Sequence, residues 1–454
     1  MKNMIKVLSF ITLCLTLTSF VLSLNVYAQA PQHIRIALMR NFSNQQQISI
    51  GDNQVIIGIW NNAFVQTNTV SSENGFTATS VNGRVQIVSS TGQIIQSSAA
   101  DGSMVIQGSN NMTRIGEYLF RGVIELRPSG NQVSAINIVS LEYYLRSVVP
   151  SEMGTGFHIQ AYRAQAVASR TFAVHQITGG THAGNPHFDL CDSTCCQVYL
   201  GVARENDITT QAVLDTTGIM IYFQGAPISA HFFASSGGAT DNSENVWGAV
   251  RPYLRGVSEI ATENIQPWTR HFTWNELSNI ANSGGFNIGQ VYALEITNMS
   301  ANGRVQELTF RGFNGTRSVQ REQIRTIFST AGQASLMSRM FTISGGGGGT
   351  QGAAEHVVVT SGVQTQTRSV NDLIAINGAG GSANLITGFI YDGTTLRQLD
   401  SGSMMITGGQ GVTIQGRGHG HGVGMSQMGA EAMARQGMTF QQILLHYFTG
   451  VEVR

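Results

Sequence analysis

Residues 141–153 read LEYYLRSVVPSEM, and the organisation of the chain follows from this stretch. Ser140 is a favoured N-cap residue, so it can begin a short helix directly after itself. Proline lacks an N–H group and fixes its own backbone angle, so Pro150 is expected to stop that helix. Residues 151–156 then form a loop that carries Glu152.

An alanine-rich helix is expected after this loop. Ala161, Ala164, Ala168 and Phe172 recur at steps of three and four residues, which is the spacing of one helix face. The surrounding residues are mostly good helix formers, so the pattern predicts a helix over 158–176. The small side chains on its apolar face favour close packing against a neighbour.

The chain before residue 140 has a different pattern of residue types. Short runs of β-branched and apolar residues alternate with Asn, Ser, Asp and Gly, which is typical of strands joined by turns. These runs lie at 34–38, 55–60, 84–88, 122–126 and 133–139. The N-terminal half is therefore predicted to be mostly β.

The residue composition changes twice in the last third of the chain. Five glycines at 345–349 open a Ser/Thr/Gly-rich stretch that extends to about residue 410 and reads as a β-like insertion. A helix is expected over 426–436, closed by Gly437. The string TFQQ at 439–442 is a capping box that begins a further helix.

Together these patterns predict a mixed α+β fold with a β-rich N-terminal part, a helix-containing core, a Gly-rich β-like insertion and two C-terminal helices. The expected divisions are a leader at 1–28, a β-rich region at 29–130, the core at 131–344, the insertion at 345–410 and the last part of the core at 411–454.

Composition narrows the class of function. The 454 residues are enough for two to three domains. Charged residues make up only 11%, and the formal net charge is zero with no block of Lys or Arg. A nucleic-acid binder carries a basic patch, so nucleic acids are not expected partners.

The N-terminus reads as an export signal. Lys2 and Lys6 precede an apolar run at 7–24, and small residues lead to an expected cut after Ala28. This pattern predicts a protein that is secreted or held in the cell envelope, outside the cytoplasmic membrane. The alternative is an uncleaved membrane anchor, because the run is near the lower length limit for spanning.

Three cysteines cluster beyond the leader. Cys191, Cys195 and Cys196 lie within ten positions of His187, and four such ligands could close a structural Cys3His zinc site. The spacing is not that of a zinc finger or ribbon. A disulfide such as Cys191 to Cys196 with a spare thiol, or three free thiols, are the alternatives.

Glu152 is the candidate for proton transfer. Partial burial between two apolar helices would raise the pKa of its carboxyl group toward neutrality and make it a usable general acid. The alternative is that Glu152 caps the N-terminus of the following helix, where a negative charge is stabilised. Spacing by itself does not separate the two.

Two further segments carry polar groups. The string GRGHGHGVGMSQ at 416–427 lacks the ending of a phosphate loop, so it is read as the polar wall of a substrate cleft or as a plain glycine-rich turn. His419 and His421 are too few to argue a metal site. Ser236 lacks the surroundings of a nucleophilic serine, so its hydroxyl group is expected to hydrogen-bond instead.

These strings resemble those of the SpoIID/LytB family, which includes stage II sporulation protein D and proteins described as amidase enhancers. The most specific strings are VPSEM at 149–153 and GHGVGMSQ at 420–427. The likeness runs in the family's order through 141–153, 189–201, 233–247 with 252–257, and 416–450. It leaves residues 345–410 outside.

The resemblance implies a peptidoglycan lytic transglycosylase that prefers glycan strands without stem peptides, with Glu152 as catalytic acid and base. Such a single carboxyl group needs no cofactor for the chemistry. The resemblance further suggests a sugar-binding wall made of polar side chains at Gln197, Tyr199, Ser236, His421, Ser426 and Gln427. The alternative is a non-catalytic glycan-binding enhancer of a cell-wall amidase.

Some members of that family hold zinc in the segment that resembles His187 to Cys196, and others lack the ligands. This chain departs from the pattern at two positions. Cys195 stands beside Cys196 where a His-Cys pair is expected, and His419 stands where an aromatic residue is common. The first departure concerns the ligands expected for zinc, and the second concerns one expected contact with the sugar.

Overall fold

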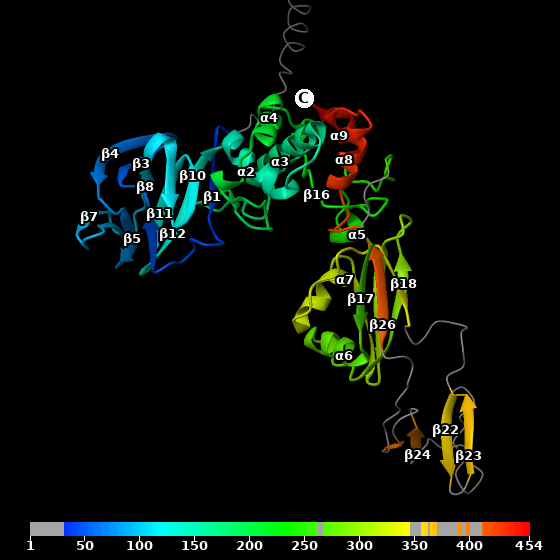
Figure 1. Cartoon of the computed structure of the whole chain (residues 1–454). Helices are drawn as coiled ribbons and strands as arrows, with labels where there is room; N and C mark the ends of the chain where they lie inside the picture. Colours follow the sequence, from blue (N-terminus) through cyan, green and yellow to red (C-terminus); the bar gives the residue numbers. More distant parts are fainter. Residues whose placement is uncertain are drawn as a thin grey trace, which may run out of the picture. The chain divides into compact units, whose positions relative to one another are not determined.

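The computed structural model describes residues 31–261, 267–345 and 411–454, together with the backbone of four strands between 356 and 399. The chain divides into two compact units (Figure 1). Unit 1 comprises residues up to Phe232 together with Met433–Arg454, and unit 2 comprises Phe233–Ala432. Both units contain helices and strands, so the predicted mixed α+β class is confirmed.

Unit 1 begins with two β-sheets. One is seven-stranded, in the order β13 (Leu190–Cys191), β1 (His33–Ala37), β12 (Gln132–Ser140), β11 (Val123–Ser129), β8 (Met104–Gln107), β3 (Gln54–Trp60) and β4 (Phe64–Ser71). The other is six-stranded, in the order β10 (Tyr118–Arg121), β9 (Met112–Ile115), β2 (Gln47–Ile50), β5 (Phe76–Val81), β6 (Arg84–Ser89) and β7 (Ile94–Ser97).

The two sheets pack on one another through the apolar faces of their strands. Strand β12 contacts both β5 and β2 of the other sheet. Burial alternates along β5, as a half-buried strand requires, and Ala78 is completely buried there. All five apolar runs predicted from the sequence are strands, because each has one face that this packing removes from water.

Helix α2 (Leu141–Met153) follows β12 without a break and corrects one prediction. Ser140 caps it as expected, accepting a hydrogen bond from Tyr143 N–H at 3.2 Å. Pro150 does not stop the helix, which ends three residues later at Met153 with Gly154 as its C-cap. Only one helical turn follows Pro150, and two hydrogen bonds occupy carbonyl groups at this end of the helix. Ser151 Oγ donates to Ser147 O at 2.7 Å, and Gly154 N–H donates to Pro150 O at 2.9 Å.

The residue that ends α2 must adopt an unusual conformation. Gly154 has φ of 71°, in the left-handed region where glycine has no steric penalty. The next helix, α3 (Ile159–Gly179), is capped by His158, whose Nδ1 accepts a hydrogen bond from Gln160 N–H at 3.2 Å. Glu152 is therefore in the last turn of α2 and does not cap the following helix.

A buried arginine on α3 fixes the two helices together. Arg170 is completely buried, and its guanidinium group donates to both oxygens of Glu142 on α2, at 2.6 and 2.8 Å. The same group donates to Val213 O and Ile219 O, which flank the end of helix α4 (Asp207–Asp215). Three helices thus meet on one positive charge, and Figure 1 shows them side by side.

The C-terminus returns to unit 1. Helix α9 (Phe440–Tyr447) begins with the predicted capping box of Thr439 and Gln442, and it packs on α3. Strand β28 (Glu452–Val453) then pairs with β14 (Ile221–Phe223), which also pairs with β15 (Ala226–Pro227).

Unit 2 is built around two three-stranded sheets. One has the order β17 (Pro267–Phe272), β26 (Val412–Arg417) and β21 (Phe341–Ser344), and the other has the order β18 (Val291–Met299), β19 (Val305–Gly312) and β20 (Gly315–Gln320). Helices α5 (Glu244–Trp247), α6 (Trp274–Ser283) and α7 (Gln323–Thr326) belong to this unit, and α8 (Gln427–Arg435) begins in it.

Strand β26 follows the predicted insertion but pairs with β17 and β21, which precede it. A chain interrupted by 345–410 therefore rejoins the same sheet. Within 345–410 the structure describes only the backbone of two hairpins, β22 (His356–Ser361) with β23 (Gln364–Ser369) and β24 (Gly388–Tyr391) with β25 (Leu396–Leu399).

The predicted leader at 1–28 lies outside the described residues. In the part of the chain that is described, no helix combines the length and apolar character needed to cross a membrane.

A fully buried ion pair in unit 2 is expected to dominate the stability of that unit. Arg339 and Asp241 lie 3.0 Å apart with side chains at most 1% exposed. Asp241→Asn would leave the Arg339 charge buried without its counter-charge, which costs about 3–5 kcal/mol. Urea denaturation measures this free energy of unfolding.

The control is a half-exposed pair of the same unit. Glu244 and Arg255 lie 2.6 Å apart near solvent, so Glu244→Gln is expected to cost only about 0–1 kcal/mol. Equal losses in the two variants would show that burial of the Arg339 pair is not what sets the cost.

Candidate functional site

Glu152 is positioned by a hydrogen bond from a loop that is distant in sequence. Its Oε1 accepts from Val198 N–H at 2.8 Å. The other oxygen, Oε2, has no hydrogen-bond partner among the described residues and is not among their buried, unpaired atoms. A proton on the neutral carboxyl group therefore belongs on Oε2, the oxygen that solvent or a ligand can reach.

Burial raises the pKa of Glu152 above its ordinary value. The hydrogen bond from Val198 N–H opposes this shift, because it stabilises the ionised form, but burial is the larger cause. No cation in the described part of the chain contributes, so no positive charge there pulls the pKa of this carboxyl group back down. The half-buried Glu152 thus has the environment of a proton donor, as the sequence suggested.

Residues 196–200 dock against α2 at three more points. Ser147 Oγ accepts from Leu200 N–H at 3.2 Å, one and a half turns before Glu152 on the same helix. Tyr144 O–H donates to Gln197 Oε1 at 3.1 Å. The Tyr144 and Tyr199 rings lie 5.1 Å apart between centroids.

Gln197 and Tyr199, predicted as sugar contacts, are both almost fully buried. Tyr199 O–H donates to Asn137 Oδ1 at 2.7 Å, and Asn137 in turn donates to Val123 O at 3.0 Å. Both side chains hold the loop in place, so a positioning role is what the structure gives them. Direct contact between either residue and a sugar stays a prediction.

The sequence analysis missed the residues that receive this loop. Ser147 and Tyr144 lie within residues 141–153, but nothing in the spacing there indicates that they bind a segment more than fifty residues away. The polar residues on an otherwise apolar helix are the only signal, and that signal is weak.

The three cysteines meet a different histidine from the one predicted. The sulfur atoms of Cys191, Cys195 and Cys196 and a ring nitrogen of His182 all lie within 4.8 Å of one another. His182 Nε2 is 3.6 Å from Cys195 Sγ. His187 is not part of this cluster.

Two backbone turns that directly follow α3 explain why His182, and not His187, lies beside the cysteines. Ala183 N–H donates to Gly180 O, and Asn185 N–H donates to His182 O, so the chain folds back directly after the helix. His187 instead donates through its backbone N–H to Asn185 Oδ1, and its carbonyl accepts from Arg35 Nε. The histidine nearest the cysteines in sequence is therefore held away from them by its own backbone.

The cluster fits a four-coordinate metal. Three thiols and one imidazole at this separation are the donor set of a closed structural zinc site. The disulfide suggested from the sequence, Cys191 to Cys196, is not the pairing in the structure. The sulfurs in bonding contact are those of Cys191 and Cys195, which leaves Cys196 as a thiol. Their Cα atoms are 7.1 Å apart, beyond the roughly 4.4–6.8 Å usual for a disulfide, which favours the metal.

Edge pairing anchors the cysteine loop to the sheet. Strand β13 lies parallel to β1, with Ala37 opposite Cys191. Arg35 N–H donates to Asp189 Oδ2 at 2.8 Å, and Asp192 N–H donates to Ala37 O at 3.1 Å. These bonds fix the segment that carries the cysteines to the sheet edge, and Val198, the donor to Glu152, follows it directly.

The remaining predicted residues lie in unit 2, where Ser236 and Ser426 are completely buried and meet. Ser426 Oγ accepts from Ser236 N–H at 3.2 Å and from Gly429 N–H at 3.1 Å. Ser236 Oγ accepts from Gly238 N–H at 2.9 Å. These hydroxyl groups organise a turn and the start of α8, and Gln427, at the first position of α8, is nearly buried too.

His421 is the accessible member of this set. Its Nδ1 accepts from Val423 N–H at 3.1 Å, which puts the proton of the neutral ring on Nε2. The ring lies 5.3 Å from that of Phe233 and 5.1 Å from that of Trp247. Trp247 is 41% exposed, and it is an aromatic neighbour that the sequence analysis did not single out.

A buried arginine supports the glycine-rich segment. Arg304 donates to Ser236 O and to Ala239 O. Gly422 packs directly on its guanidinium group, where a Cβ atom would lie 2.5 Å from Cζ. Gly422 also has φ of 88°, so close approach and backbone conformation both require glycine there. Ser236, His421, Ser426 and Gln427 as sugar contacts stay predictions.

Comparison with known proteins agrees with this arrangement. The family model described as SpoIID, stage II sporulation protein, matches residues 129–223. That segment contains α2, α3, the cysteine cluster and Val198. Over this segment the chain is similar to the SpoIID family. The family match therefore covers both Glu152 and Val198, the donor to its carboxyl group.

Relatives of the SpoIID family extend the likeness beyond that segment. Stage II sporulation protein D of Bacillus subtilis (strain 168) is 26% identical over 331 residues, 70% of this chain and 76% of the relative. The amidase enhancer of the same organism is 28% identical over 316 residues, 67% of this chain and 39% of the relative.

A further relative is an uncharacterized protein of Brachyspira hyodysenteriae. It is 35% identical over 161 residues, 35% of this chain and 43% of the relative. The alignment thus spans less than half the length of that protein and of the amidase enhancer.

The raised pKa of Glu152 predicts a pH-dependent stability with a definite sign. The folded protein binds this proton more tightly than the unfolded chain does, so stability falls as pH rises through the interval between the two pKa values. Glu152→Gln removes this effect and keeps the acceptor for Val198 N–H. We expect the variant to be more stable than wild type at pH 8, with a smaller difference at pH 4.

Urea midpoints at both pH values measure the difference. The matched control is Glu142→Gln on the same helix, which is expected to destabilise the protein at pH 8 because buried Arg170 loses its partner. A Glu152→Gln variant that is less stable than wild type at pH 8 would contradict the assignment of a buried, proton-binding carboxyl group.

Proposed function

We propose that the protein is an exported lytic transglycosylase that cleaves the bond between N-acetylmuramic acid and N-acetylglucosamine in peptidoglycan glycan strands. The observation that carries the proposal is the environment of the Glu152 carboxyl group. One oxygen is fixed by Val198 N–H, the other is accessible, and burial raises the pKa of the group. Similarity to the SpoIID family over residues 129–223, and to a relative named amidase enhancer, supports the substrate class.

In the first step Glu152 acts as a general acid. The proton on Oε2 passes to the glycosidic oxygen as its bond to the anomeric carbon of N-acetylmuramic acid breaks, and positive charge develops on the sugar ring. Val198 N–H holds Oε1, so the carboxyl group stays oriented as it loses the proton. The same hydrogen bond stabilises the carboxylate that results.

In the second step the carboxylate acts as a base. It takes the proton from the primary hydroxyl group of the same muramic acid residue, and that oxygen forms the new bond to the anomeric carbon. The product is an anhydro-muramic end, and no water is consumed. An intramolecular nucleophile has a high effective concentration, which is why a single carboxyl group suffices.

The pH dependence of activity follows from these roles. The acid form must be present at the start of each turnover, so the rate is expected to fall as pH rises through the raised pKa of Glu152. The chemistry needs no cofactor.

The cysteine cluster is proposed to bind structural zinc through Cys191, Cys195, Cys196 and His182. A closed four-coordinate site contributes folding energy and takes no part in bond cleavage. The ligands would hold the loop that begins at the sheet edge and presents Val198 to Glu152.

A second candidate function rests on one relative. The similarity to a protein named amidase enhancer suggests that this chain binds glycan and stimulates a separate cell-wall amidase. The predicted leader places either activity outside the cytoplasmic membrane, in solution or in the envelope. The two candidates differ in whether the glycan is cut.

The decisive experiment digests purified glycan strands without stem peptides and identifies the products by mass spectrometry. Wild type is expected to produce anhydro-muramic ends. Glu152→Gln is expected to lower the rate by at least about 100-fold, the lower range for loss of a general acid, while retaining the fold. Ser151→Ala is the neighbouring control and is expected to keep most of the activity.

Two other results would overturn the proposal. Reducing ends in place of anhydro ends would indicate an ordinary hydrolase that uses water. Intact strands with folded wild-type protein, together with amidase stimulation that survives Glu152→Gln, would favour the enhancer.

The zinc proposal has its own test. Native mass spectrometry of the mature chain is expected to show one bound zinc ion that is lost in His182→Ala and retained in His187→Ala. The structure separates these two histidines, whereas the sequence did not. Loss of zinc from His187→Ala alone, or no zinc in wild type with a Cys191 to Cys195 disulfide, would contradict it.

A further inference from the structure

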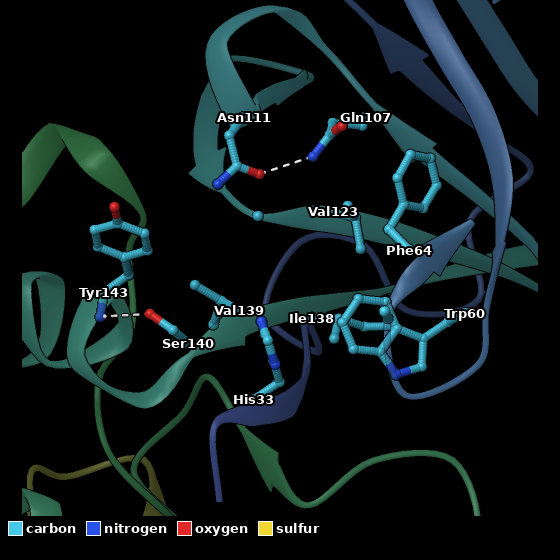
Figure 2. A pocket seen from close by; sticks show the side chains of 12 residues that line it. His33, Trp60, Phe64, Gln107, Asn111, Val123, Ile138, Val139, Ser140 and Tyr143 are labelled. Carbon is cyan, nitrogen blue, oxygen red and sulfur yellow. Dashed lines mark hydrogen bonds between the residues drawn. The ribbon is translucent and has the colours of Figure 1, made fainter. Parts of the chain in front are cut away.

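A separate pocket lies in unit 1, between the seven-stranded sheet and the start of α2. Its cavity volume is about 190 Å³. Figure 2 shows the side chains that line it, most of them from β1, β3, β4, β8, β11, β12 and α2. Eight of the twelve lining residues precede residue 129, where the family match begins, so most of the pocket lies outside that match.

The pocket has an apolar floor and aromatic walls. Val123 and Ile138 belong to a small buried cluster, against which Trp60 and Phe64 pack as partly buried side chains. The ring of His33 meets that of Trp60 edge-on, with centroids 5.2 Å apart. Aromatic rings that stay partly accessible above a fixed floor offer flat surfaces for a ligand.

Two amide side chains form a polar edge. Gln107 Nε2 donates to Asn111 Oδ1 at 2.7 Å, as Figure 2 shows. This bond orients both groups, and among the described residues it leaves Gln107 Oε1 as an acceptor and Asn111 Nδ2 as a donor for a ligand. The edge therefore presents one acceptor and one donor at fixed positions.

The lining is largely uncharged. None of the twelve lining residues is Asp, Glu, Lys or Arg, and His33 supplies the one imidazole. A basic peptide would lose its hydration in the pocket without gaining a counter-charge. A neutral ligand with apolar faces and amide or hydroxyl groups matches the lining.

The pocket and Glu152 are joined by one helix. Tyr143 lines the pocket from the first turn of α2, with Arg121 and Arg146 over its ring at 5.1 and 4.7 Å. Glu152 lies nine residues later on that helix, which corresponds to roughly 14 Å along its axis. Nine residues are also about two and a half turns, so Tyr143 and Glu152 lie on opposite faces of α2, and the pocket is a site apart from Glu152.

We propose that this pocket is an accessory subsite for an N-acetylglucosamine residue of the glycan strand. The C–H face of the sugar packs on Trp60 and Phe64, and its acetamido and hydroxyl groups bond to Gln107 and Asn111. N-acetylmuramic acid of a stripped strand carries a carboxylate, for which the lining offers no Lys or Arg. The inference rests on the proposed function, because that function supplies the strand.

The test measures binding of the N-acetylglucosamine tetramer to the mature chain carrying Glu152→Gln, so that no cleavage interferes. Calorimetry gives the affinity, and the indole N–H resonance of Trp60 in NMR spectra reports on the pocket itself. Adding Trp60→Ala is expected to weaken binding at least tenfold. Adding Asn111→Asp, which replaces a donor by an acceptor at an exposed turn, is expected to weaken it several-fold without unfolding.

The matched control is Phe313→Ala, an exposed aromatic residue of unit 2 whose ring lies 5.5 Å from that of Tyr292. It is expected to bind as the parent does. The subsite is refuted if Trp60→Ala and Asn111→Asp both bind like the parent, or if a stem peptide shifts the Trp60 resonance and the sugar does not.

Failure of the subsite and failure of the proposed function give different results. Anhydro products from wild type, with tetramer binding unaffected by the pocket variants, would refute the subsite alone. Tetramer binding at Trp60 with no cleavage by wild type would refute the transglycosylase and leave the subsite standing.

Discussion

The hydrogen bond from Val198 N–H to Glu152 Oε1 is the interaction on which the candidate site depends. It joins the end of a helix to a loop that lies 46 residues further along the chain. One oxygen of the carboxyl group is held, so the other is left to carry the proton. Burial at the same place raises the pKa, so orientation and protonation have a common structural origin.

The rest of unit 1 keeps that bond in place. Buried Arg170 fixes α2 against α3 and α4 through Glu142 and two carbonyl groups. On the loop side, strand β13 fixes the cysteine segment to the sheet edge, and Ser147 binds Leu200 N–H. The helix and the loop are thus each held independently of the hydrogen bond that joins them.

Unit 2 uses buried polar groups in a similar way. The hydroxyl groups of Ser236 and Ser426 satisfy backbone N–H groups, and Arg304 satisfies carbonyl groups of the same turn. These contacts shape the segment that presents His421 beside Trp247. Most of the polar residues singled out from the sequence therefore support the backbone, and few of them face solvent.

Local patterns in the sequence determined the strands, the alanine-rich helix and the capping box at Thr439, whereas the choice of Glu152 came from the resemblance to a known family. Each of those local patterns depends on residues close together in the chain, where alternation, capping and helix spacing act directly. Pro150 was misjudged because its effect depends on the residues after it, and Ser151 and Gly154 satisfy the last turn of α2.

Only the tertiary structure decided which groups meet. The sequence offered His187 to the cysteines, but two turns after α3 bring His182 to them instead. Nothing local marks Val198 as the donor to Glu152, because a backbone N–H group is the same at every residue other than proline. Contacts between distant segments depend on how the helices and sheets pack, and a linear pattern of residue types does not contain that information.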